Sequence, residues 1–569
     1  MNMEPEILAE YMGARVVHSD DVKTPNLLMT LPVPVKENIA PFFSMHEGIG
    51  NTVLLPSPDY SAVPLQSNTH GEERKESTPN SIYLQTGAYD LRDVKIPQSH
   101  IVYIFGAEGL YRSQTKLMRL LITLRSHMRR DQILFLPGLA LPHRYGIYSL
   151  LGVDLFDTAP IVQATREELF LTNEGWLPLQ RMKDPVFHGE TLLEHNTNTA
   201  FLEAANVRQA IHSDTLRTLV EARSAWDPWS SSVLRILDRD WYGSVEPFVP
   251  VVGDSLPAPL PHAVDWPEVR RYRERYAERY RRPELADVLL LLPCSATKPY
   301  SMSRGHKTIR SILWDAGMAS RVHVVVVTSP LGIVPGELET YYPCMQYDTA
   351  VTGDWTREEK ETSRAMLERL LSHPYSHTIV HLPEDYDDTV PDLDGDVVHT
   401  CAKRIASFES LRNLDEALQS IEGRGSGKED MRERLRQDMT SRLAYQFGSA
   451  GEALMEGAGI RGRYPDLKII ARGVQRGMLT RQRGMVSLTL EGADILARQS
   501  VYSVEIEDFE VKGDIFAIGV KEASEDIRIG DDVVVKHGEE VRGVGVAAMS
   551  YKAMIEGKRG VAVKIRKHA

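Results

Sequence analysis

The chain has 569 residues, 42% of them hydrophobic and 25% charged, which is typical of a globular protein with several domains. With only three cysteines and no apolar run long enough to span a bilayer, the composition excludes a small disulfide scaffold and an integral membrane protein. The net charge is −13, yet residues 460–483 carry seven cations and one acid, and residues 558–569 carry five cations and no acid. The sequence predicts a reduced, cytoplasmic protein whose basic carboxyl-terminal quarter either binds a polyanion or solvates a sheet face.

The first predicted region, residues 1–264, alternates strands with helices. Residues 26–32 and 99–105 are predicted strands, and residues 113–128 a predicted helix, which favours an α/β layer or barrel. Residues 266–283 follow, rich in arginine and with tyrosines at helical spacing. This pattern predicts an amphipathic helix that packs between domains, in preference to a face that stacks on bases; the tyrosines are Tyr272, Tyr276 and Tyr280.

The region 265–425 repeats an apolar strand, a polar loop and a helix. Its four predicted strands, continuous in Val, Leu and Ile, indicate a parallel sheet buried on both faces; they are residues 287–292, 322–328, 378–382 and 396–400. Ligands bind at the carboxyl ends of strands in such sheets. Ligand-binding residues are therefore expected in the segments that follow the strands, residues 293–295, 329–332 and 383–386.

Chemically active side chains concentrate in the loop 293–307. If Ser303 caps the next helix, the helix dipole together with Lys298 and His306 would lower the pKa of the Cys294 thiol. A thiolate attacks a carbon that is multiply bonded to nitrogen or oxygen. Each residue also has a plainer interpretation: a buried structural cysteine, a phosphate-binding lysine, a helix-surface histidine. No CxxC pair or metal-ligand spacing occurs, so we predict no metal.

Residues 426–495 are predicted to form a small α+β module, in which a helix precedes short strands that carry the first basic cluster. Residues 496–569 alternate β-rich runs with glycine turns, which predicts a small barrel.

The loop resembles the signature of archaeosine synthases: Pro-Cys-Ser, two variable residues, Lys-Pro-Tyr, then two spaced serines and a histidine. The matching residues are Pro293, Cys294, Ser295, Lys298, Pro299, Tyr300, Ser303 and His306, while Gly305 replaces the second serine. Further matches are the segment 329–332 and Pro335, Glu337, Leu338, Glu339, Tyr342, Pro343, Tyr347 and Asp348.

Both ends of the chain carry further resemblances. Residues 1–264 resemble an archaeal tRNA-guanine transglycosylase, with Asp157 in the place of its nucleophile, but its second catalytic Asp and its Cys-rich zinc motif are not found. This implies a degenerate TIM-barrel-type domain that holds tRNA or a nucleobase, with a vestigial Asp157. Residues 496–569 resemble a PUA domain, which implies RNA binding. The expected RNA-binding residues are Arg461, Arg463, Arg472, Arg476, Lys564 and Arg566.

The resemblance implies a tRNA-modifying enzyme that needs no bound cofactor. It would add the nitrogen of lysine, glutamine or ammonia to the nitrile of 7-cyano-7-deazaguanine in the D-loop of tRNA, forming an amidine. We hypothesise that Cys294 attacks the nitrile carbon, that His306 moves a proton, and that Lys298 stabilises the thiolate or holds a phosphate. The expected substrate-binding residues are Ser295, Tyr300, Ser303, Ser329, Glu337 and Asp348, with one of the two acids holding a cationic donor.

The resemblance also suggests a radical-SAM partner that completes the product, and a homodimer. Two alternatives stay open. One is an active transglycosylase that uses Asp157 for base exchange, and the other is a noncatalytic tRNA-binding protein in which the Cys294 loop is structural.

Overall fold

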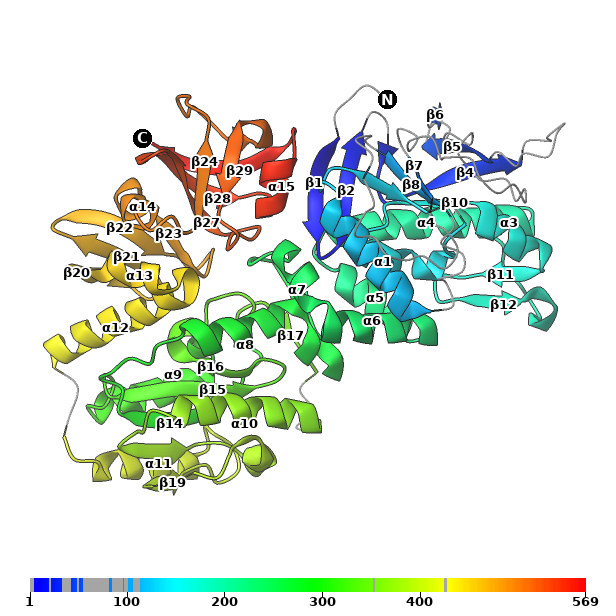
Figure 1. Ribbon diagram of the computed structural model, residues 1–569. Helices are drawn as coiled ribbons and strands as arrows, with labels where there is room; N and C mark the ends of the chain where they lie inside the picture. Colours follow the sequence, from blue (N-terminus) through cyan, green and yellow to red (C-terminus); the bar gives the residue numbers. More distant parts are fainter. Residues whose placement is uncertain are drawn as a thin grey trace. The chain divides into compact units, whose positions relative to one another are not determined.

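The computed structural model describes residues 5–19, 22–32, 42–48, 51–54, 81–83, 96, 101–105, 113–136, 138–350, 354–393, 395–423 and 427–569. The chain divides into two compact units (Figure 1). The first comprises residues 1–249 with 514–522 and 548–563, and the second residues 250–513 with 523–547 and 564–569. No helix in the described ranges combines the length and apolar character needed to cross a bilayer.

The first unit contains an open seven-stranded sheet of order β6-β5-β4-β10-β9-β8-β7, in which β5 pairs antiparallel with both β4 and β6, and the strands from β4 to β7 pair in parallel. Its strands are β4 Asn26–Pro32, β5 Phe42–Gly48, β6 Asn51–Leu54, β7 Ser81–Tyr83, β8 Ile101–Phe105, β9 Ile133–Phe135 and β10 Leu155–Asp157. The strands predicted at 26–32 and 99–105 are confirmed, except that residues 99–100 lie outside the described ranges.

Smaller sheets and the helices complete this unit. The small strands are β1 Glu6–Tyr11, β2 Ala14–Ser19, β3 Val22–Lys23, β11 Leu169–Leu171 and β12 Trp176–Pro178. The helices are α1 Gln114–His127, α2 Tyr145–Leu150, α3 Ala159–Arg166, α4 Leu192–His212, α5 Leu216–Ser224, α6 Pro228–Asp240 and α7 Tyr242–Val245. The predicted helix at 113–128 is α1, and the mixed α/β class is confirmed.

The second unit is built on a five-stranded sheet of order β16-β15-β14-β18-β19, parallel except for β16 at one edge. All six residues of β14 are buried, as a strand covered on both faces requires. The four predicted strands and their parallel arrangement are confirmed. The strands are β14 Val288–Pro293, β15 Val322–Thr328, β16 Gly332–Pro335, β18 His377–Val380 and β19 Val397–His399.

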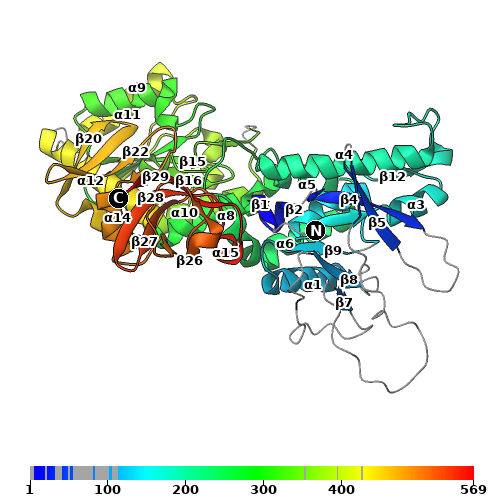
Figure 2. The same ribbon diagram turned by 90° about the horizontal axis from the view of Figure 1, so that it is seen from above.

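Helices cover both faces of this sheet. Figure 2 shows α9 and α11 on one side and α8 and α10 on the other, in agreement with two separate hydrophobic cores. The helices are α8 Pro267–Arg279, α9 Arg304–Asp315, α10 Arg357–Leu371 and α11 Phe408–Ser420. The tyrosines at helical spacing on and just after α8 are buried in the core, so the packing interpretation of that stripe is confirmed.

The same unit contains the basic module. Helix α12 Lys428–Phe447 and the short α13 Ser449–Glu452 precede an antiparallel sheet, as predicted, and α14 Leu490–Ala497 follows it. The sheet strands are β20 Ala458–Arg463, β21 Asp466–Ala471, β22 Val474–Leu479 and β23 Val486–Leu488. A short parallel pair, β13 Leu256–Pro257 and β17 Tyr347–Asp348, flanks the sheet of the α/β core.

The carboxyl-terminal strands form a six-stranded sheet of order β25-β29-β28-β27-β24-β26. They are β24 Ser503–Ile506, β25 Ile515–Phe516, β26 Val520–Ala523, β27 Asp532–His537, β28 Glu540–Ala547 and β29 Val561–His568, with α15 Tyr551–Glu556 before the last strand.

Asp532, at the start of β27, joins this sheet to the basic module. Its side chain is fully buried and accepts hydrogen bonds from Arg483 and Arg566 and from the backbone N–H of Leu488, at 2.8–2.9 Å. A buried carboxylate with two guanidinium partners is stable only while those partners are present. Asp532 therefore stabilises the junction, together with the hydrogen bonds from Arg483 to the Gly530 carbonyl and from Arg566 to the Leu488 carbonyl.

Candidate active site

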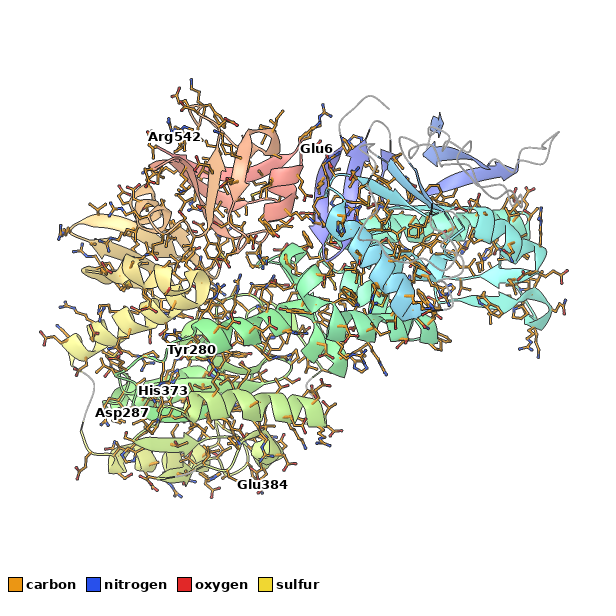
Figure 3. All side chains as sticks on the ribbon, in the orientation of Figure 1. Glu6, Tyr280, Asp287, His373, Glu384 and Arg542 are labelled. Atoms are coloured by element: carbon orange, nitrogen blue, oxygen red, sulfur yellow. The ribbon has the colours of Figure 1, made fainter. Side chains whose placement is uncertain are left out.

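Cys294 directly follows β14 at the carboxyl edge of the sheet. Its Sγ lies 3.7 Å from the hydroxyl of Tyr386, which belongs to the turn after the neighbouring strand β18. Figure 3 labels Asp287, which precedes β14, and Glu384, which begins that turn, so the two mark opposite ends of the sheet. The structure thus brings together two of the three segments that the strand pattern singled out.

Lys298 provides a cation in the same loop as the thiol, and its ammonium group contacts Tyr347. Its Nζ lies 3.3 Å from the centroid of the Tyr347 ring and donates a hydrogen bond to the Tyr347 carbonyl. Burial lowers the pKa of Lys298, while the negative charges of Asp348 and of a Cys294 thiolate act in the opposite direction. The ammonium group is therefore held on Tyr347, and the neighbouring residue Asp348 is exposed.

Tyr347, which Lys298 contacts, belongs to a chain of three hydrogen-bonded hydroxyls. The hydroxyl of Tyr300 lies 2.6 Å from that of Tyr347, which is bonded in turn to Thr328 at the end of β15. Burial raises the pKa of both phenols, so they remain neutral donors. Tyr347, Tyr386 and Thr328 were not among the predicted site residues. Tyr347 lay among the family matches and Tyr386 in a segment singled out at a strand end, and these were the signals that could have found them.

His306 and Ser303 fix the conformation of the loop through hydrogen bonds. The Ser303 hydroxyl accepts the His306 backbone N–H at 3.3 Å and caps α9, as predicted. The His306 ring is buried, and its Nε2 donates to the carbonyl of Pro293 at 3.0 Å. Burial lowers the pKa of His306, so the imidazole is neutral and bonded to the residue that precedes Cys294.

The remaining predicted substrate-binding residues are engaged within the protein. Ser295 donates to the carbonyl of Thr297 at 2.8 Å, and Ser329 donates to the carboxylate of Glu359 on α10. Glu337 is buried, bonded to the hydroxyl of Tyr280 and 3.4 Å from His323. Although burial opposes its ionisation, His323 and Tyr280 lower the pKa of Glu337.

The six predicted RNA-binding residues fall into two groups. Arg461, Arg463, Arg472 and Lys564 are exposed. Arg476 donates to the carbonyls of Leu454 and Glu456 at 3.0 and 2.7 Å, and Arg566 is bonded to Asp532. The pairing of β20 with β21 places Arg461 opposite Lys468, so Arg461, Arg463 and Lys468 lie on one face of that sheet, whereas Lys564 belongs to the carboxyl-terminal sheet.

Asp157, at the end of β10 in the first unit, is bound by backbone. Its carboxylate accepts the N–H groups of Gly138 and Ala159 at 2.6 and 2.7 Å. Burial raises the pKa of Asp157 to about 6, against the effect of these two hydrogen bonds. Within the described ranges, no three His, Cys, Asp or Glu side chains gather as metal ligands.

Comparison with known proteins defines the class. Residues 500–569 match the PUA domain, and residues 269–418 match a family described as a domain of unknown function, DUF5591. The chain is 26% identical over 474 residues to tRNA-guanine(15) transglycosylase of Methanothermobacter thermautotrophicus, covering 76% of this chain and 65% of that protein. These matches and the Cys294 site indicate a tRNA-modifying enzyme with a carboxyl-terminal PUA domain.

Two more similar relatives specify the family. The chain is 34% identical over 560 residues to archaeosine synthase subunit alpha of Methanosarcina acetivorans, covering 91% of this chain and 88% of that protein. It is 34% identical over 470 residues to archaeosine synthase of Haloferax volcanii, covering 78% of each. The chain belongs to the archaeosine synthase family.

Proposed function

We propose that this enzyme adds an amine nitrogen to the nitrile of 7-cyano-7-deazaguanine in the D-loop of tRNA and so forms an amidine. The observation that carries the proposal is the thiol of Cys294 at the carboxyl edge of the sheet, 3.7 Å from the Tyr386 hydroxyl, with Lys298 in the same loop. A nitrile gains a proton on nitrogen as its carbon is attacked, so a nucleophile next to proton donors suits this reaction.

The reaction proceeds in two balanced steps. The Cys294 sulfur bonds to the nitrile carbon, one carbon–nitrogen π bond breaks, and the nitrogen takes a proton, which leaves a thioimidate. The amine then attacks the same carbon, the carbon–sulfur bond breaks, and the thiol regains a proton as the amine loses one. The product is an amidine, and Cys294 is restored. No cofactor enters either step.

We assign the proton transfer to Tyr386, because its hydroxyl lies 3.7 Å from the thiol, whereas the Nε2 of His306 is bonded to the carbonyl of Pro293. His306 then positions the backbone that carries Cys294. Lys298 stabilises the thiolate. Of the two predicted acids, Asp348 suits a cationic donor such as lysine because it is exposed beside Lys298, whereas Glu337 is buried and paired.

The decisive experiment supplies the donors separately. The purified chain is incubated with tRNA that contains 7-cyano-7-deazaguanine and with lysine, glutamine or ammonium, and the nucleosides are weighed by mass spectrometry. A gain of whole lysine indicates an enzyme whose product a further partner, such as a radical-SAM protein, completes. A gain of ammonia indicates a self-sufficient enzyme. No gain with any donor contradicts the proposal and favours a noncatalytic tRNA-binding protein.

Replacement of Tyr386 by phenylalanine removes the nearest proton donor and keeps the ring. We expect kcat to fall about a hundredfold with little change in KM, because general acid catalysis acts on the transition state. Tyr375→Phe is the matched control, since its hydroxyl contacts His323 at 2.6 Å and not the thiol. Equal rates for Tyr386→Phe and wild type would assign the proton to another group.

The charge of Lys298 predicts a pH effect. Because burial lowers its pKa from 10.5, activity should decline as the pH rises through this lowered value and the cation is lost. Lys298→Arg keeps a cation at every accessible pH, so the alkaline decline should disappear from its profile. A decline of the same shape in the arginine variant would show that a different group titrates.

The exposed arginines of β20 are proposed to contact tRNA phosphates. Affinity for tRNA should fall with salt less steeply when both Arg461 and Arg463 are replaced by glutamine. The slope of log K against log salt concentration should decrease in magnitude by about two. Filter binding at several salt concentrations measures this slope. Arg357→Gln, an equally exposed arginine on α10, is the control and should leave the slope unchanged.

We further propose that the chain has four domains: 1–264, a degenerate transglycosylase-like TIM-barrel-type domain that holds tRNA; 265–425, the catalytic core; 426–495, the basic module; and 496–569, the PUA domain. The backbone contacts of Asp157 support a structural role for this residue. Guanine exchange into unmodified tRNA would favour the transglycosylase alternative. A homodimer is the proposed assembly.

A further inference from the structure

A cavity of about 460 Å³ lies in the second unit between α9, the first half of β15 and α12. Its lining is rich in positive charge, with four arginines and two acids; the arginines are Arg310, Arg432, Arg434 and Arg442. None of the residues assigned to catalysis lines this cavity, so it is distinct from the Cys294 site.

The charges of the lining do not balance. Arg434 is bonded to Asp438 and to the carbonyls of Ser320 and Val322, and the other acid, Glu337, is held by Tyr280 and His323. The two acids are therefore already engaged. A surplus of guanidinium groups around one cavity attracts an anion.

Arg442 is the clearest indication of a ligand. Only 3% of this residue is exposed, and among the described residues its Nε and Nη1 have no hydrogen-bond acceptor. A buried guanidinium with unmade hydrogen bonds is costly for the folded protein. An anion in the cavity would supply the missing acceptors, and phosphate offers the geometry that arginine binds best.

The cavity lining also includes an exposed aromatic side chain on α9. Trp314, near the end of α9, is 58% exposed although it lines the cavity. The lining also includes the apolar residues Leu313 and Leu435. An exposed indole next to a set of arginines matches the sites in which a base stacks while its phosphate is neutralised.

Glu339 connects this cavity with the catalytic loop and with the basic strands. One carboxylate oxygen accepts the backbone N–H of Ser301 at 2.8 Å. The other accepts the hydroxyl of Tyr464 at 2.7 Å and lies 3.9 Å from Arg310. Tyr464 lines the cavity and follows Arg463, one of the exposed cations of β20. This continuity with the basic face favours RNA over another anion.

We propose that the cavity binds one nucleotide of the tRNA substrate, with its phosphate at Arg442 and Arg432 and its base against Trp314. The inference rests on the proposed function, because it takes tRNA as the substrate.

The test measures tRNA affinity in the full-length Cys294→Ala protein, which separates binding from chemistry. Trp314→Ala should weaken binding of 7-cyano-7-deazaguanine tRNA about tenfold, and Trp314→Phe should restore most of it, because stacking needs an aromatic ring. Arg432→Gln should reduce the salt slope by about one. Phe408→Ala, at an aromatic residue that is 83% exposed at the start of α11, is the control.

Arg442 needs a second readout because it is buried. Arg442→Met should weaken tRNA binding at least as much as Trp314→Ala while leaving the melting temperature unchanged or higher, since it removes an unsatisfied charge. A large fall in melting temperature with unchanged binding would show a structural role and contradict the proposal.

Unchanged affinity in Trp314→Ala and Arg432→Gln would overturn the inference and assign the cavity to a smaller anion or to a protein partner. A different outcome separates the two proposals. If tRNA binds and the cavity variants weaken that binding, but no amine donor gives a product, the proposed function is refuted and this inference stands.

Discussion

Replacement of Cys294 by alanine is expected to reduce amidine formation at least about a thousandfold, because the covalent route loses its nucleophile. Binding of nitrile-containing tRNA should stay within about twofold of wild type, since only the sulfur is removed. Single-turnover mass spectrometry of the nucleosides measures the first quantity, and filter binding measures the second. In wild type the same assay, quenched early, should also capture a tRNA–protein adduct.

The matched control is Cys401→Ala. Cys401 is partly exposed like Cys294, and its thiol contacts Ser410 in the first turn of α11. Its replacement should leave turnover unchanged. Full turnover in Cys294→Ala would contradict the thioimidate, and direct addition of the amine in a polarising pocket would replace it.

The largest stability effect is expected at Asp532. Its replacement by alanine should destabilise the second unit by about 3–5 kcal/mol, because Arg483 and Arg566 lose their common buried carboxylate and Leu488 loses an acceptor. Thermal unfolding followed by circular dichroism measures the change as an earlier transition. Asp532→Asn keeps an oxygen for Leu488 and should fall between alanine and wild type.

Asp508→Ala is the control for this prediction. Its carboxylate is 74% exposed and pairs with Arg542 at 3.2 Å, so its loss should cost less than about 0.5 kcal/mol. If both alanine variants melt like wild type, the buried cluster at Asp532 does not hold the junction together.

The sequence by itself determined the strands of the α/β core and the cap of α9. Continuous runs of Val, Leu and Ile suit a strand covered on both faces, and Ser303 offers a side-chain acceptor to the free N–H of His306; both depend on neighbouring residues alone. The family motif likewise identified Cys294 and Lys298 from the sequence, because all its residues lie in one continuous loop. The pattern of parallel strands also predicted that this loop lies at the carboxyl edge of the sheet.

Only the tertiary structure decided which side chains meet. Tyr386 reaches Cys294 across 92 residues of sequence, and no local pattern encodes the pairing of β14 with β18. From the sequence, the predicted RNA-binding cations could not be told apart. In the folded chain Arg476 and Arg566 donate to acceptors within the protein, while Arg461 and Arg463 remain exposed. Burial and partner choice depend on long-range packing, so the surplus charge at Arg442 was also hidden until the chain folded.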